Sequence, residues 1–201
     1  MASTTEIANL ALAHLGVGKA ISTLDTEQSE EARVCRLFYD IARDATLKDF
    51  PWPFATAFAA VGLVEEDPTD EWAFSYRVPS DCLHVRRILS GTRNETRQTR
   101  VPYKLGVDSA GGLLYTDAED AEIEYTVRQD DPGRYPADFV LAFSERLSAY
   151  VAPRLTAGDP FKLSEKVLRL YFLEMSNARA NAVNEQQDEE LPKSELERAR
   201  E

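Results

Sequence analysis

Apolar residues recur every three or four positions near both ends of the chain, which predicts helices there. Residues 3–6 match a capping box, and an apolar stripe over residues 7–15 follows until Gly16. A second helix is predicted from about residue 25 to about residue 48, because its apolar residues return at the same spacing. The Pro-Trp-Pro sequence at 51–53 should end it, since proline has no amide proton and restricts the residue before it.

The middle of the chain has the period of a β-strand instead. In residues 122–128, Ile123, Tyr125 and Val127 alternate with polar residues, and residues 72–76 alternate in the same way. Turn signals rich in proline, glycine and aspartate separate such runs. We therefore predict a small, mainly antiparallel sheet between the second helix and the third.

Two more helices are predicted after the sheet. One begins near Pro136, and Pro153 should kink it or end it. The other opens at Asp159-Pro160, so the two form a helical hairpin. Beyond about Asn184 the sequence is rich in glutamate and nearly devoid of apolar residues, which predicts a tail that is frayed or is ordered by a partner.

The predicted fold class is therefore α+β, with a helical bundle made by the N- and C-terminal helices and an inserted small antiparallel β-sheet lobe. The bundle would comprise residues 1–50 and 134–184, and the β-rich inserted lobe residues 51–133. Residues 185–201 would form an acidic C-terminal tail that we expect to be mobile. The two ends of the chain must then meet in space.

The composition is that of a folded, acidic protein. With 201 residues, 43% of them hydrophobic, the chain can bury a sizeable core. Its formal charge of -12 disfavours wrapping around nucleic acid, which needs clustered lysine and arginine. No run approaches the roughly 18 to 20 apolar residues that span a bilayer, and Glu6 stands where a signal peptide carries positive charge. We expect a cytosolic protein with no membrane partner.

Cys82 and His84 form the one pair around which a nucleophile or a metal site can be imagined. A zinc site needs three or four ligands, however, and the only other histidine, His14, lies in the first predicted helix without a matching motif. Two cysteines in a cytosolic chain are most simply two reduced structural thiols. We predict no catalytic, metal-binding or cofactor-binding residues.

The densest positive cluster is the best candidate for a contact with a partner. Because the protein is acidic, we favour a neighbouring subunit's carboxylates over nucleic acid, since charge complementarity fixes register in assemblies. Solvated loop residues are the simpler alternative. The candidate subunit or partner contacts are Arg86, Arg87, Arg93, Arg97 and Arg100 in this cluster, and Glu189, Leu191 and Lys193 in the tail.

Three stretches carry a family resemblance in their order along the chain. They are Ile7-Ala8-Asn9-Leu10-Ala11-Leu12 with His14-Leu15-Gly16, then Pro51-Trp52-Pro53-Phe54-Ala55, then Trp72, Phe74 and Tyr76 with Pro79-Ser80-Asp81-Cys82-Leu83. Together they resemble the tail tubular protein A family of tailed phages, the head-to-tail connector adaptors. The match runs over most of the chain but leaves residues 93–121 unmatched.

The resemblance implies a structural virion protein of the tail or neck, assembled in the cytoplasm of the bacterial host. Such adaptors form a ring, commonly of twelve subunits, that binds beneath the portal protein and carries the tail tube or nozzle protein. Genomic DNA passes through the lumen without specific recognition, and an acidic wall would let it slide. The tail of this chain would order on the portal or on a neighbouring subunit.

Other functions fit the same sequence. A head-completion or neck protein of a long-tailed phage, or the adaptor of a gene-transfer particle, would have a similar layout. A cytosolic protein-binding module and an enzyme that uses Cys82 are further alternatives.

Overall fold

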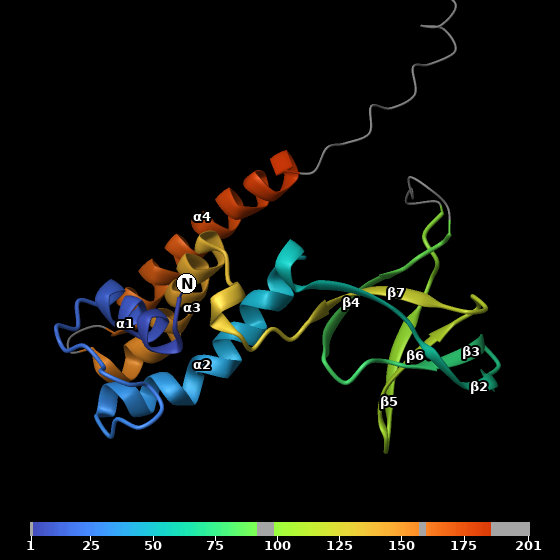
Figure 1. Cartoon of the computed structure of the whole chain (residues 1–201), viewed down its shortest axis with the longest axis horizontal. Helices are drawn as coiled ribbons and strands as arrows, with labels where there is room; N and C mark the ends of the chain where they lie inside the picture. The colour runs from blue at the N-terminus through green and yellow to red at the C-terminus, as the bar shows by residue number, and fades with distance from the viewer. Residues whose placement is uncertain (1, 92–98, 157–159, 186–201) are drawn as a thin grey trace, which may run out of the picture.

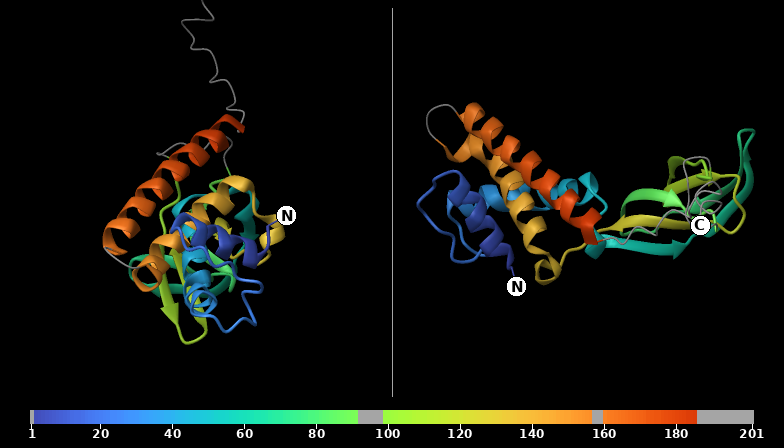
Figure 2. Two further views of the ribbon diagram at one scale, coloured as in Figure 1. Left: turned by 90° about the vertical axis from the view of Figure 1, so that its left-hand side faces the viewer. Right: turned by 90° about the horizontal axis from the view of Figure 1, so that it is seen from above.

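In the computed structural model of the chain, helices occupy one end of an elongated molecule and sheets the other (Figures 1 and 2). The structure describes residues 2–91, 99–156 and 160–185. Within them it has four α-helices and seven strands: α1 (Thr4–His14), α2 (Glu30–Asp49), β1 (Thr56–Ala60), β2 (Gly62–Thr69), β3 (Trp72–Arg77), β4 (Cys82–Ile88), β5 (Lys104–Asp108), β6 (Gly111–Thr116), β7 (Glu122–Val127), α3 (Ala137–Leu155) and α4 (Pro160–Glu185).

Both N-terminal helices begin at a serine cap. The capping box predicted for α1 is confirmed: Ser3 Oγ accepts the Glu6 amide at 3.1 Å, and the Glu6 carboxylate accepts the Ser3 amide at 2.8 Å. The predicted start of α2 near residue 25 is wrong, because Ser29 is its cap. Arg36 donates to the carbonyl groups of Asp25 and Glu27 at 3.1 and 2.8 Å, which holds the preceding link in a non-helical path.

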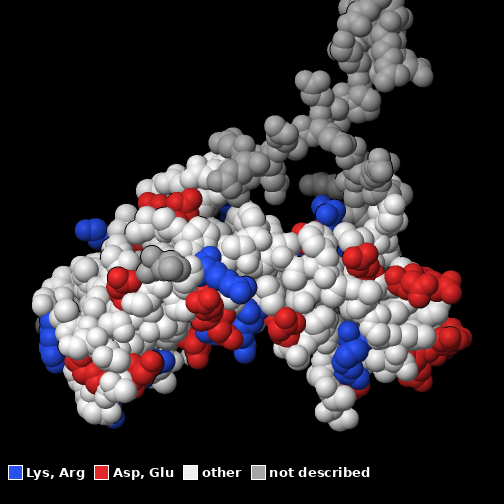
Figure 3. All heavy atoms as spheres, in the orientation of Figure 1, with Lys and Arg blue, Asp and Glu red and all other residues white. Residues whose placement is uncertain are grey.

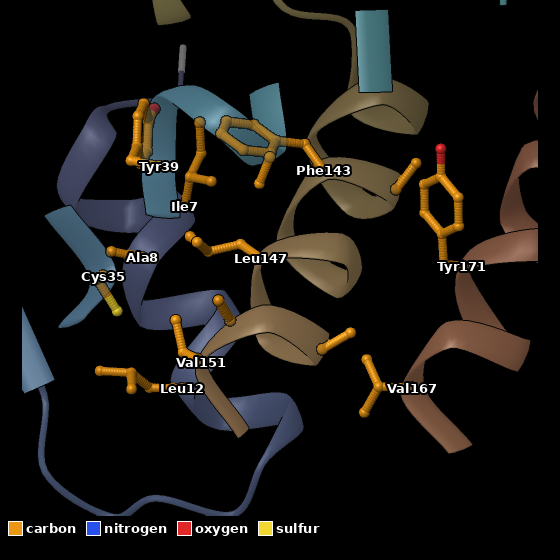
Figure 4. Close-up of a cluster of buried hydrophobic side chains, with 14 of the residues drawn as sticks. Ile7, Ala8, Leu12, Cys35, Tyr39, Phe143, Leu147, Val151, Val167 and Tyr171 are labelled. Carbon is orange, nitrogen blue, oxygen red and sulfur yellow. The ribbon is translucent and has the colours of Figure 1, made fainter. Parts of the chain in front are cut away.

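The central helix is α3, and α1, α2 and α4 each pack on it. Its apolar side chains, Phe143, Leu147 and Val151 among them, are fully buried between the other three helices (Figure 4). The neighbours contribute Ile7 from α1 and Tyr171 from α4 to the same core. Burial of such side chains, at roughly 1.5 to 3 kcal/mol each, is the main stabilising contribution at this end of the molecule.

The strands form two antiparallel sheets. One sheet has the order β1-β7-β4 and the other β2-β3-β6-β5. Their shared core is separate from the helical core and consists of Val61, Tyr76, Val85, Ile88, Leu114, Ala121, Ile123 and Tyr125. The predicted strands at 72–76 and 122–128 correspond to β3 and β7.

The predicted layout, a helical bundle from the chain ends with a small inserted sheet lobe, is wrong. The protein is α+β, but its β region is two substantial sheets of seven strands among the described residues. The helices form no bundle of terminal helices either, since α1 and α2 contact each other only slightly and both depend on α3. The sheets were underestimated because exposed strands such as β2 have no buried face and so show no alternation.

The predicted domain boundaries, 1–50 with 134–184 against 51–133, stay a prediction. Of the tail predicted at 185–201, only Glu185, the last residue of α4, lies within the described residues. No helix in the described part of the chain has the length and apolar character needed to cross a bilayer.

The two ends of the molecule are joined where α2 meets the sheets. Trp52 is buried there, and its indole N–H donates to the Thr46 carbonyl at 3.0 Å. Its ring makes edge contacts with Phe50 and Phe139, with centroids 5.2 and 5.1 Å apart. Val127 of β7 packs against both cores, so the apolar contacts are continuous across the junction.

Between α3 and α4 lies a buried carboxyl group that no described residue satisfies. Glu145 is 6% exposed, and its Oε2 atom has no hydrogen-bond partner among the described residues. Burial, and then the charge of Glu174 on α4, raise the pKa of Glu145 to about 7. The native state therefore binds this proton more tightly than the unfolded chain does.

We predict that stability falls as the pH rises from about 4.5 to about 7, because the unfolded chain loses the Glu145 proton first. Glu145→Gln should remove this part of the pH dependence and be more stable at pH 8 by roughly 1–3 kcal/mol. Urea unfolding of both proteins between pH 5 and pH 8 measures the difference. Glu122→Gln, at an exposed position of β7, is the control. Equal slopes for wild type and Glu145→Gln would contradict the assignment.

Candidate functional site

Arg86 of β4 reaches the carboxyl end of α2. That helix ends at Asp49, because Phe50 is extended and precedes a proline. The last carbonyl groups of a helix have no partner within it, and a cation there is favourable. Arg86 Nη2 donates to the carbonyl oxygens of Leu47, Lys48 and Phe50 at 3.2, 3.0 and 2.9 Å.

The same guanidinium is also tied to the sheet. Its Nε donates to Oγ1 of Thr126, a fully buried residue of β7, at 2.8 Å. Burial lowers the pKa of Arg86, while Glu124 and Asp49 act in the opposite sense. Arg86 thus joins α2, β4 and β7, and its Nη1 atom makes no hydrogen bond to a described residue.

The neighbouring arginine makes an ion pair within the sheet. Arg87 and Glu124 are partners in the register of β4 and β7, and Arg87 Nε lies 2.6 Å from the Glu124 carboxylate. The Glu124 side chain is mostly buried, whereas that of Arg87 is partly exposed. A half-buried, charge-assisted pair of this kind is stronger than a surface pair.

A pocket of about 520 Å³ opens beside these residues. We call it the arginine pocket, and its lining residues are Pro51, Arg86, Arg87, Ile88, Arg100, Val101, Tyr103 and Glu124. Tyr103 is held in place because its hydroxyl donates to the Val85 carbonyl at 3.0 Å. Arg100 is exposed and has no ion-pair partner among the described residues. The walls therefore carry three guanidinium groups and one carboxylate.

The arginine pocket brings together three of the residues singled out from the sequence, Arg86, Arg87 and Arg100. Their role as contacts to a subunit or partner stays a prediction, and for Arg86 the structure adds an internal role. The other predicted contacts, Arg93, Arg97, Glu189, Leu191 and Lys193, lie outside the described residues.

Tyr103 and Glu124 are pocket residues that the sequence reasoning missed. Each comes from a different segment, and neither belongs to a local motif. The sequence does contain one signal for Glu124: the alternation of β7 puts it on the face opposite Ile123 and Tyr125. Its partner Arg87 follows only from the strand register, which the sequence does not give.

Cys82 and His84 both lie on β4, and burial shifts the pKa of each. Burial raises the pKa of the Cys82 thiol to about 11, so little of the nucleophilic thiolate exists at neutral pH. Burial also lowers the pKa of His84, with Arg86 and Lys48 adding to the effect. Across the described parts of the chain, no group of three or more His, Cys, Asp or Glu residues is arranged to hold a metal ion.

Part of the negative charge gathers at the end of the sheet region. Figure 3 shows acidic side chains gathered over the end of the sheet region farthest from the helices, where β2 and β3 lie. The exposed acidic residues of β2 and of the turn that leads to β3 are Glu65, Glu66, Asp67, Asp70 and Glu71. The charge of the chain is thus unevenly distributed over its surface.

Two helices expose large apolar side chains outside their buried stripes. On α2, Leu37 and Ile41 are 58% and 57% exposed, one helical turn apart; we call them the α2 patch. On α4, Phe172 and Leu173 are 65% and 56% exposed, and we call them the α4 patch; Phe161, three turns earlier, is 75% exposed. The two helices lie on different sides of α3 (Figure 2). Side chains of this size are usually covered in an assembly when they gather on one surface.

We compared the sequence with protein-family models and with curated proteins, and neither comparison found a match. The resemblance to the tail tubular protein A family therefore rests on the residues quoted above.

We predict that Arg86→Gln lowers the free energy of unfolding by about 1–3 kcal/mol, because the carbonyl groups at the end of α2 and the buried Thr126 hydroxyl lose their donor. Arg100→Gln removes a charge from the same pocket without removing a bond between described residues, so its effect should stay within about 0.5 kcal/mol. Urea unfolding of the two variants measures both. Equal stabilities would show that Arg86 does not hold the junction.

Proposed function

We propose that this protein is a structural subunit of a phage head-to-tail connector, an adaptor that forms a ring between the portal and the tail. The observation that carries the proposal is the pair of exposed apolar patches, the α2 patch and the α4 patch, on two helices that each pack on α3. A soluble monomer gains nothing from two such surfaces, since each exposes apolar area to water at a cost of about 25 cal/mol per Å².

Two different patches suit a ring better than a dimer. A ring of identical subunits needs a heterologous interface, in which one face of a subunit meets a different face of the next. The α2 and α4 patches can serve as these two faces, because they lie on separate helices that are both anchored on α3. In a twofold dimer each patch would have to be self-complementary instead.

The charge of the chain supports the same proposal. At -12, with a group of exposed carboxylates at the end of its sheet region, the subunit has little tendency to grip a DNA backbone. A ring of such subunits would let genomic DNA pass through its lumen without binding it.

The proposed partners are the portal protein, the tail tube or nozzle protein and further copies of this chain. In the family that it resembles, a ring has about twelve subunits. The ring would be assembled in the bacterial cytoplasm and would become part of the virion neck. A neck or head-completion protein of a long-tailed phage remains the closest alternative, since it would use the same surfaces.

We predict that the wild-type protein forms rings with the portal protein of the same genome, visible in electron micrographs, and that a Leu37→Asp/Ile41→Asp double variant does not. Both positions are exposed, so the variant should fold and keep its stability within about 1 kcal/mol. Circular dichroism and a urea unfolding curve check that the variant keeps its fold.

The matched control is Val107→Asp, which places the same charge on an 80% exposed apolar residue of β5, far from the α2 patch. This control should assemble as the wild type does. Wild-type protein that stays monomeric with its portal would contradict the connector proposal. Rings formed equally well by the double variant would show that the α2 patch is not the interface.

A further inference from the structure

The arginine pocket is positively charged, although the protein as a whole is acidic. Its walls carry three guanidinium groups and a single carboxylate, although the chain as a whole has a formal charge of -12. The carboxylate, Glu124, is already paired with Arg87 at 2.6 Å. The positive charges of Arg86 and Arg100 are therefore left without a carboxylate bonded to them among the described residues.

The side chain of Arg86 is held in position in the ligand-free protein. Its Nε and Nη2 atoms are held by Thr126 and by the carbonyl groups at the end of α2. These acceptors are neutral, so they orient the guanidinium without neutralising it. Its Nη1 atom is unused by the described residues, and a ligand bonding there would cost little side-chain entropy.

Arg100 supplies the second charge from another segment. It lines the same pocket, is exposed, and bonds to no described residue, so it can turn toward a ligand. Tyr103 stands in the same wall and is fixed by its bond to the Val85 carbonyl. Ile88 and Val101 give the pocket apolar walls, which strengthen charge-assisted hydrogen bonds by lowering the local dielectric constant.

We propose that the arginine pocket is a binding site for an anionic oxygen group, a carboxylate or a phosphate, held between Arg86 and Arg100. Guanidinium groups match the geometry of both anions with paired N–H donors. A long polyanion such as DNA fits less well, because the formal charge of -12 on the whole chain repels it. The site does not depend on the connector proposal, since every residue that forms it belongs to one chain.

The test is calorimetric titration of the full-length protein at pH 7 and low ionic strength with two probes. One probe is inorganic phosphate and the other an N-acetylated tetraglutamate peptide, with sodium chloride at matched ionic strength as the blank. We expect saturable binding of at least one probe to the wild type, and about tenfold weaker binding to Arg100→Gln. Arg154→Gln, which removes an exposed arginine of α3 outside the pocket, should bind as the wild type does.

The two probes separate the sources of the anion. Tighter binding of the peptide identifies carboxylate side chains of a partner protein as the ligand, and tighter binding of phosphate identifies a phosphate or phosphoryl group. Absence of saturable binding of either probe overturns the proposal. Equal affinities of Arg100→Gln and wild type overturn it too, because binding would then lie elsewhere. Arg100 bears the substitution because, unlike Arg86, it makes no hydrogen bond to a described residue.

Discussion

The carboxyl end of α2 is the point on which the rest of the structure depends. A helix that ends at an extended Phe50 before a proline leaves carbonyl groups that need donors, and Arg86 supplies them from β4. The Trp52 indole caps the same end by bonding to the Thr46 carbonyl. Arg86 therefore connects the end of α2 to the sheets, and Val127 continues the apolar contacts between the two cores.

This junction also determines where the arginine pocket lies. The arginine pocket opens beside it because Arg86 must point toward α2, and Arg87 is the next residue along the strand. The α2 and α4 patches lie on the helices, and the exposed carboxylates of β2 and of the turn after it lie at the opposite end of the molecule. A rigid junction would keep these surfaces at fixed positions, as a ring subunit with several partners requires.

The sequence predicted features that depend on a few neighbouring residues. The capping box of Ser3 and Glu6 and the alternation of β7 are of this kind, and both are present. The start of α2 at Ser29 was missed because Arg36, a turn and a half into the helix, binds the carbonyl groups of the preceding link. The size of the sheets was missed because exposed strands do not alternate. The sequence predicted the three arginines of the arginine pocket as candidate contacts. It did not predict the pairing of Arg87 with Glu124, because that pairing depends on the register between strands far apart in the sequence.

The junction at the end of α2 should make the helices and the sheets one cooperative unit. Native-state hydrogen exchange in increasing urea tests this directly, because it gives a separate opening free energy for each element. We expect the slowest amides of α3 and of β7 to converge on one free energy of unfolding. If the amides of β7 exchange through an opening of lower free energy while those of α3 stay protected, the helices and the sheets do not form one cooperative unit.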